Sequence, residues 1–188
     1  MRGVEIETER LVLRQFTPDD LEPLAAILLH PEVARWLGPP DASIDDVARA
    51  IDRYERHWET RGYGRLAVCD RVTGGLLGRA GVVHEERWTA TTCKDELGWA
   101  TERARWGEGL ATEAARAVLR DAFERAGLRE VIAFTTPTNT ASLRVMAKLG
   151  LERRGTTTWA GGPHVWAGTS LQPRPGHRRP RVSRAGRG

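Results

Sequence analysis

Two glycines stand directly before a long amphipathic helical pattern, and this feature constrains the fold more than any other. Gly107 and Gly109 follow Trp106 and are separated by one charged residue. Downstream, apolar residues recur at helical spacing: Leu110, Ala111, Ala114, Ala115, Val118, Leu119, Ala122 and Phe123. A helix start exposes backbone N–H groups and carries partial positive charge, so it can bind an anion. Two interpretations are open: a loop that needs left-handed residues, or a backbone site for pyrophosphate.

The rest of the chain alternates between strand and helix signals. Strands are predicted at 9–16, 64–70, 76–84, 93–101, 131–135, 151–157 and 165–171. Helices are predicted at 17–29, 31–38, 43–58, 110–126 and 139–150, with Thr17 and Ser43 as caps and Gly150 as the last stop signal. The segment RVTGG, between two strands, is typical of a hairpin turn. Strands that first form a meander and then alternate with helices predict a mixed α/β domain.

Composition divides the 188 residues into one folded unit and a tail. The chain carries 29 basic and 25 acidic residues, but residues 172–188 hold six arginines and no acid. Residues 1–171 therefore hold 23 basic and 25 acidic groups, which gives a net charge of −2 and no overall signature of polyanion binding. We predict a domain at 1–171 and a disordered Arg/Pro/Gly-rich tail at 172–188.

Several classes of protein are disfavoured by the sequence. No window is apolar enough to span a membrane, and the acidic N-terminal segment does not resemble a signal peptide. Two cysteines and five scattered histidines offer neither a disulfide framework nor a metal-ligand spacing. The expectation is a cytoplasmic protein, monomeric or homodimeric, without a metal.

Four ordered motifs carry a resemblance to a known family. They are TERLVLRQFTPDD at 8–20, ELGWA at 96–100, WGEGLATEA at 106–114 and NTASLRVMAKLGLERRG at 139–155. Together they resemble the GNAT superfamily of N-acetyltransferases, and in particular the branch of bacterial ribosomal-protein-alanine N-acetyltransferases. The superfamily's Gln/Arg-x-x-Gly-x-Gly/Ala pattern here has Trp106 at its first position and Gly109 and Ala111 at its small positions.

The resemblance implies a GNAT-like mixed α/β fold with acetyl-CoA as co-substrate. The expected sheet is central, mostly antiparallel and six- to seven-stranded, with splayed middle strands and about four flanking helices. Pyrophosphate would bind the loop before the long helix, and the pantetheine arm would pair with the splayed strand like an added strand. The residues expected to contact the co-substrate are Leu97, Gly98, Trp99, Trp106, Gly107, Glu108, Gly109, Leu110, Ala111, Thr112, Asn139 and Ser142.

Catalytic roles also follow from the resemblance. The reaction is direct attack of an amine on the thioester, which requires removal of a proton from the ammonium by a base or a water chain. Glu96 is the candidate base, Ser142 the candidate acid for the leaving thiolate, and Asn139 a contact to pantetheine or water. A backbone N–H near Gly98 or Trp99 would stabilise the oxyanion.

Each of these residues has a structural alternative. Asn139 is also a good helix N-cap, Ser142 a small helix residue, and Glu96 a candidate for an ordinary ion pair. His84 is a weaker candidate base. Three tryptophans either line an acceptor cleft or fill the core: Trp36, Trp58 and Trp88.

The acceptor is left open between a protein N-terminus, a small metabolite and an aminoglycoside-type antibiotic. Five acids near the second long helix would suit a cationic acceptor, or are merely solvated: Asp41, Asp45, Asp46, Asp52 and Glu55. The closing segment, 165–171, has small residues where the family is apolar and aromatic, and it is therefore predicted to be short or poorly paired.

A second functional hypothesis belongs to another class. The chain would be a catalytically inactive acyl-CoA-binding regulator or a ribosome- or RNA-associated scaffold that uses its tail. The six arginines predict only weak, non-specific contact with nucleic acid, because the tail has no aromatic residue for base stacking. A dinucleotide oxidoreductase is disfavoured, because its glycine loop would open an early βαβ unit.

Overall fold

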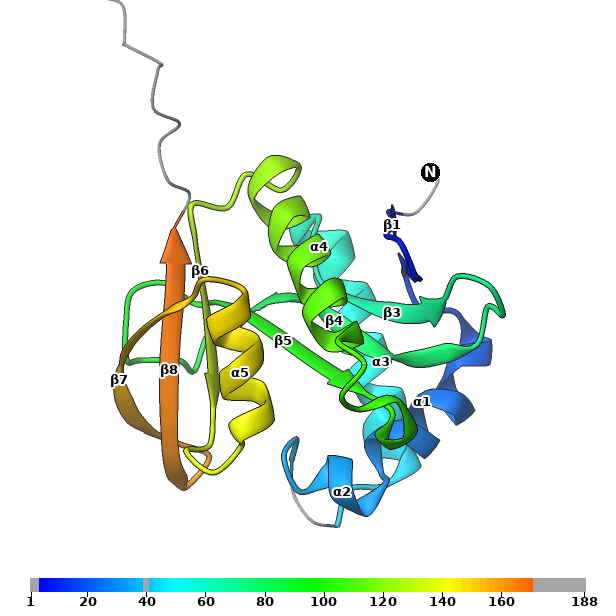
Figure 1. Cartoon of the computed structure of the whole chain (residues 1–188), viewed down its shortest axis with the longest axis horizontal. Helices are drawn as coiled ribbons and strands as arrows, with labels where there is room; N and C mark the ends of the chain where they lie inside the picture. The colour runs from blue at the N-terminus through cyan, green and yellow to red at the C-terminus, as the bar shows by residue number, and fades with distance from the viewer. Residues whose placement is uncertain (1–3, 39–40, 171–188) are drawn as a thin grey trace, which may run out of the picture.

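The computed structural model describes residues 4–38 and 41–170, and it confirms a mixed α/β fold (Figure 1). The strands are β1 (Glu5–Glu7), β2 (Leu11–Arg14), β3 (Arg65–Asp70), β4 (Leu76–His84), β5 (Asp95–Thr101), β6 (Glu130–Thr135), β7 (Glu152–Trp159) and β8 (Gly162–Ser170). The α-helices are α1 (Leu21–Leu28), α2 (Pro31–Ala34), α3 (Ile44–Arg61), α4 (Leu110–Glu124) and α5 (Thr140–Lys148). Short 3-10 turns lie at η1 (Pro18–Asp20) and η2 (Arg103–Arg105).

The eight strands form one sheet in the order β1-β2-β3-β4-β5-β6-β8-β7. Every neighbouring pair is antiparallel except β5 and β6, which are parallel and share a single register pair, Glu96 with Ile132. Beyond that pair the two strands separate, and Figure 1 shows β5 running away from β6 at an angle. The predicted splay of the middle strands is therefore confirmed.

Helices cover both faces of the sheet because alternate residues of the strands point to opposite sides. Leu66 and Val68 of β3 belong to the larger core with α4 and α5, whereas Ala67 and Cys69 belong to a second core with α1 and α3. Most of the apolar residues of α4 that helical spacing predicted to face the core are buried in the larger core, Ala114 and Ala115 among them.

The counts implied by the resemblance need correction: the described ranges hold eight strands rather than six to seven, and the five α-helices that the local signals predicted rather than about four. The strand missing from the prediction is β1. Its sequence, Glu-Ile-Glu, has little apolar signal, and as an edge strand it pairs only with β2.

The closing strand also differs from expectation. β8 spans Gly162–Ser170 and is paired on both sides, with β6 over Thr135–Glu130 and with β7 over Trp159–Glu152. Small residues do not weaken it, because two flanking ladders hold its backbone and Val165 and Ala167 are buried. The tail at 172–188 lies outside the described residues, so its predicted disorder and the domain boundary remain predictions.

The predicted local signals hold where the chain turns. Ser43 and Asp46 form a capping box at the start of α3, with the Ser43 backbone N and Oγ both 2.8 Å from the Asp46 carboxylate. Gly150, after α5, is left-handed with φ of +76°. Among the residues described, no helix is both long and apolar enough to cross a bilayer.

Candidate active site

A cleft opens where β5 and β6 separate. Its volume is about 1020 Å³, which is ample for a large cofactor. The lining comes from β4, β5, the glycine loop, the first turn of α4, the end of β6, α5, the turn between β7 and β8, and the segment 33–38. All the residues expected from the sequence to form the site line this cleft except Glu108.

The glycine loop leads into α4, and the start of this helix has no side-chain cap among the described residues. Gly107 and Gly109 are both left-handed, with φ of +88° and +84°. A Cβ on Gly107 would meet nothing within 4 Å, so backbone conformation, rather than crowding, requires glycine there. The first N–H groups of α4 are orphan donors, and Leu110, Ala111 and Thr112, which carry them, line the cleft.

Acidic side chains beside the loop are neutralised by arginines. The Glu113 carboxylate accepts hydrogen bonds from Thr8 Oγ1 at 2.6 Å and from Arg10 Nε at 2.7 Å. Burial alone would raise the pKa of Glu113, but the hydrogen bonds from Thr8 and Arg10 hold it below the usual range. Glu108 is paired with Arg105, with 2.9 Å between Nε and the carboxylate, so the loop presents little uncompensated negative charge.

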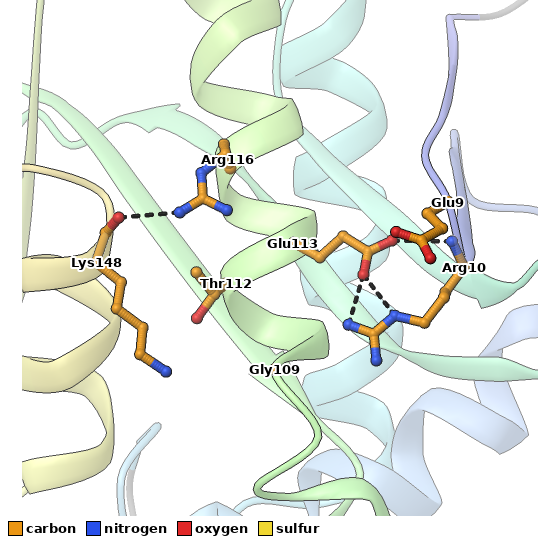
Figure 2. Close-up of a pocket in the computed structure, with 7 residues that line it drawn as sticks. All are labelled: Glu9, Arg10, Gly109, Thr112, Glu113, Arg116 and Lys148. Carbon is orange, nitrogen blue, oxygen red and sulfur yellow. Dashed lines mark hydrogen bonds and ion pairs between the residues drawn. The ribbon is translucent and has the colours of Figure 1, made fainter.

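Cations that sequence reasoning did not single out surround the same helix start. A second cavity of about 400 Å³ beside Gly109 is lined by Arg10, Arg116 and Lys148, among others. Figure 2 shows Lys148 and Arg116 on the side of α4 that faces α5; Arg116 Nη2 donates to the Lys148 carbonyl at 3.0 Å. These side chains come from the bend before β2, from α4 and from α5, and only the fold brings them together.

Asn139 and Ser142 lie at the start of α5 and line the cleft. Asn139 Oδ1 accepts a hydrogen bond from the Ser142 backbone N at 3.1 Å, so Asn139 is the N-cap of α5. The side chain of Asn139 is also buried, which fixes its amide group at the cleft wall.

Glu96 is buried and ion-paired with Arg65, which donates to Glu96 Oε2 through Nη2. Arg65 also donates through Nη1 to the carbonyls of Gly98, at 3.0 Å, and Gly81. The second carboxylate oxygen lies over Gly98, since a Cβ there would come within 2.8 Å of Glu96 Oε1. Arg65 carried no signal in the sequence, because 31 residues separate it from Glu96.

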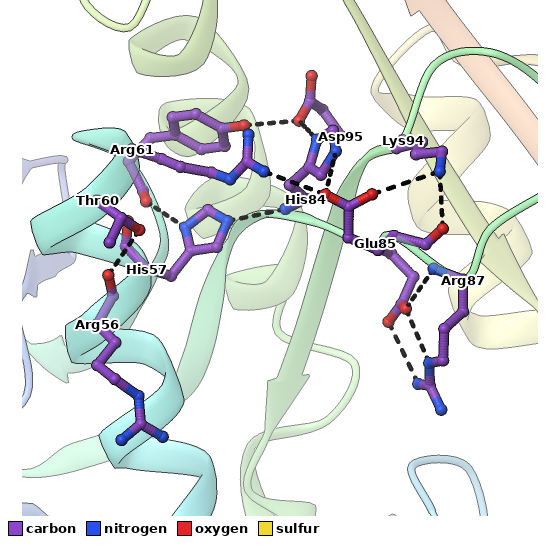
Figure 3. A network of polar contacts seen from close by, with 11 residues as sticks. Arg56, His57, Thr60, Arg61, His84, Glu85, Arg87, Lys94 and Asp95 are labelled. Carbon is purple, nitrogen blue, oxygen red and sulfur yellow. Dashed lines mark hydrogen bonds and ion pairs between the residues drawn. The ribbon is translucent and has the colours of Figure 1, made fainter.

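His84 lies outside the cleft lining. Its Nδ1 is 2.9 Å from Asp95 Oδ1, and Tyr63 Oη donates to the same oxygen at 2.6 Å. Its backbone N–H donates to His57 Nε2 at 2.9 Å, within the polar network of Figure 3.

The three tryptophans divide between cleft and core. Trp36 lines the cleft. Trp58 is in the larger core and donates Nε1 to the Arg65 carbonyl at 2.8 Å. Trp88 is buried and stacks on Phe134 with ring centroids 4.5 Å apart.

None of the five acids that would suit a cationic acceptor lines the cleft. Asp46 is engaged as a cap and with Arg49, and Asp41, Asp45 and Asp52 are exposed. The charges that do line the cleft are mostly positive: Arg35, Arg65, Arg79, Arg87, Arg105, Arg144 and Lys148, against Glu85 and Glu96. Within the described ranges, no group of three or more His, Cys, Asp or Glu side chains is arranged to hold a metal ion.

The site therefore combines a sheet split at one parallel strand pair with the start of a helix that no described side chain caps. Residues 10–152 match the family model described as "Acetyltransferase (GNAT) domain", and the chain belongs to this family. The family uses acetyl-CoA as acetyl donor.

Individual proteins agree with this assignment. The chain is 40% identical over 152 residues to the uncharacterized N-acetyltransferase YnaD of Bacillus subtilis, covering 81% of this chain and 85% of YnaD. A crystal structure of an acetyltransferase from Agrobacterium tumefaciens shares the fold with a TM-score of 0.80 at 23% identity, over 91% of this chain and 96% of that one.

The predicted resemblance to ribosomal-protein acetyltransferases is also found among solved structures. The ribosomal-protein-S5-alanine acetyltransferase of Vibrio fischeri has a TM-score of 0.72 at 17% identity, over 89% of this chain and 96% of that one. This likeness concerns the fold and does not identify the acceptor.

Proposed function

We propose that this GNAT N-acetyltransferase transfers an acetyl group from acetyl-CoA to a primary amine, by direct attack of the amine on the thioester. The observation that carries the proposal is the uncapped start of α4, preceded by two left-handed glycines, beside the split between β5 and β6. The acceptor amine belongs either to a protein N-terminus or to a small molecule.

Binding of the co-substrate is assigned to backbone groups. The N–H groups from Gly107 to Thr112 bind the pyrophosphate, with helix-dipole support and without a lysine inside the loop; the Trp106 N–H already donates to the Arg103 carbonyl. Arg144 and Lys148, which line the cleft, add positive charge around the phosphates. The edge of β5 beyond Glu96 has no partner strand on the β6 side and can pair with the pantetheine arm.

When bound, acetyl-CoA supplies the activated thioester. The backbone N–H near Gly98 or Trp99 donates to the thioester oxygen as negative charge develops there. Ser142, on the cleft wall, donates a proton to the departing sulfur, and the cap bond from Asn139 fixes the first turn that carries Ser142.

The base is assigned to Glu96, acting directly or through water. Arg65 engages one carboxylate oxygen and leaves Oε1 facing Gly98, on the side of the sheet covered by α1 and α3. An amine in the cleft would reach Oε1 beside the Arg65 guanidinium, whose Nη atoms lie over Gly98 on the same face.

The first test is calorimetric titration of acetyl-CoA into the parent chain and into Gly109→Trp. Bulk at Gly109 should abolish binding, because an indole there covers the amides of the first turn of α4. Gly74→Trp is the matched control: Gly74 is also left-handed, at φ +74°, and also has free space around it, but it lies in the β3–β4 turn. Binding by all three proteins would contradict the assigned pyrophosphate site, and binding by none would contradict the proposed function.

Acetyl transfer is then measured as CoA released from a panel of amines. A protein that binds acetyl-CoA and acetylates no amine would support the regulator hypothesis instead.

A further inference from the structure

Arg79 is a cleft cation without an ionic partner among the described residues, and it differs from the other unpaired cations of the cleft in having a buried, unbonded Nε. It lies on β4 opposite Ala100 of β5 and lines the cleft, and its Nε is buried with no hydrogen-bond partner among the described residues. The positions outside the described ranges contain no Asp or Glu at all, so no carboxylate side chain there can pair with it. Its guanidinium lies 5.8 Å from the Tyr54 ring centroid.

The other charges nearby are already compensated. Glu96 is paired with Arg65, and Glu85 accepts from Arg87 Nε at 3.0 Å. Burial lowers the pKa of the Arg79 guanidinium more than Tyr54 and Glu96 raise it, but an arginine stays protonated in proteins. The side chain is half-buried rather than fully enclosed, and a largely desolvated charge without an ionic partner is unfavourable, so this one is expected to have a functional role.

Arg79 lies on the acceptor side of the sheet. Arg79 on β4 is paired in register with Ala67 on β3, so the two residues lie on the same face of the sheet. Ala67 packs in the core with α1 and α3, whereas α4 covers the opposite face. Arg79 therefore shares a face with Glu96 and Gly98, whereas the cations proposed to bind the phosphates lie around α4 and α5. Along β5, Ala100 is two residues from Gly98, or about 7 Å.

We propose that Arg79 binds a carboxylate of the acceptor, so that the substrate is a small primary amine that also carries a carboxylate, such as an amino acid or a short peptide. A carboxylate matches the planar guanidinium fork with two parallel hydrogen bonds and a single compensating charge. The amine then lies in the cleft beside Glu96 while the carboxylate is held by Arg79. This inference rests on the proposed acetyl transfer and names its substrate class.

The test uses matched acceptors: α-, β- and γ-amino acids and dipeptides, each compared with its carboxamide. We expect kcat/KM for the acids to exceed that for the amides by about 10- to 100-fold, the value of a charge-assisted hydrogen bond. Arg79→Gln should raise KM for the acids by a similar factor and leave the amides unchanged. Arg79→Lys should recover part of the difference, and Arg53→Gln, an exposed change on α3, is the matched control.

The outcomes separate the two proposals. If the parent chain does not bind acetyl-CoA by calorimetry, the proposed function fails. If it binds acetyl-CoA but prefers the amides, acetylates only carboxylate-free amines, or acetylates no member of the panel, the assignment of Arg79 is overturned. An equal loss of activity toward acids and amides in Arg79→Gln overturns it as well, because a purely structural role would produce that result.

Discussion

The buried pair Arg65–Glu96 offers the sharpest test of how the site is held together. The two side chains are only 7% and 12% exposed, so water screens their interaction little. Arg65 also donates to the carbonyls of Gly81 on β4 and Gly98 on β5, the two strands between β3 and the split. Glu96→Gln leaves a buried guanidinium without its counter-charge, and Arg65→Met leaves a buried carboxylate.

The expected magnitude follows from this burial. Removing one partner of a buried pair lowers the free energy of unfolding by about 3–5 kcal/mol. For a chain of this size, that loss lowers Tm by roughly 10 °C. The double variant removes both charges, and its main cost is that the Gly81 and Gly98 carbonyls lose their donor. Its free energy of unfolding should therefore fall by only about 1–2 kcal/mol.

The measurement is a double-mutant cycle by urea and thermal unfolding of the three variants and the parent. The single losses should exceed the double loss by several kcal/mol. Additivity within about 0.5 kcal/mol would refute the coupling. Activity well below each Tm separates two roles of Glu96: a base is lost in Glu96→Gln even where the protein is folded, whereas a purely structural carboxylate is not.

Other variants test neighbouring features. Asn139→Ala removes the cap bond to the Ser142 amide and should lower stability by about 1 kcal/mol, while Asn139→Asp retains it; equal thermal unfolding of both would contradict the cap. Burial lowers the pKa of His57, whose Nε2 accepts from the His84 amide. The neutral form of His57 therefore adds to the free energy of unfolding, fully above a pH of about 6.5, and this contribution is lost as the pH falls through the lower pKa of the folded state. In a pH series, the free energy of unfolding of His57→Gln should fall less steeply with acid than that of the parent. Deleting residues 172–188 should leave acetyl transfer intact and reduce salt-dependent retention on nucleic acid; loss of transfer would assign the tail an essential role.

Local sequence signals predicted the glycine loop and most helices and strands correctly. Gly107, Gly109 and Gly150 adopt left-handed conformations that glycine favours, and Ser43 caps a helix through a residue three positions away. These features depend on atoms close together in the chain, and a single sequence contains them in full. β1 was missed because a three-residue edge strand between acids has too short a pattern.

The hydrophobic pattern of the sequence predicted poorly where hydrogen bonds to two neighbouring strands, rather than burial of side chains, stabilise a strand. The closing segment was predicted to be short or to pair poorly because its residues are small, yet β8 lies between β6, which pairs with 165–170, and β7, which pairs with 162–168. The order of strands is a property of the whole sheet, so it cannot be predicted from the residues of β8 alone.

By itself, the sequence determined the mixed α/β class, the two-glycine loop ahead of α4 and the residues that line the cleft along β5 and α5. Only the tertiary structure decided that Glu96 is paired with Arg65 and that Arg79 reaches the same face with no carboxylate partner. The physical reason is register. Because side chains alternate along a strand, a slip of one residue between β3, β4 and β5 would move these charges to the opposite face, and the many contacts of the folded sheet together choose the register.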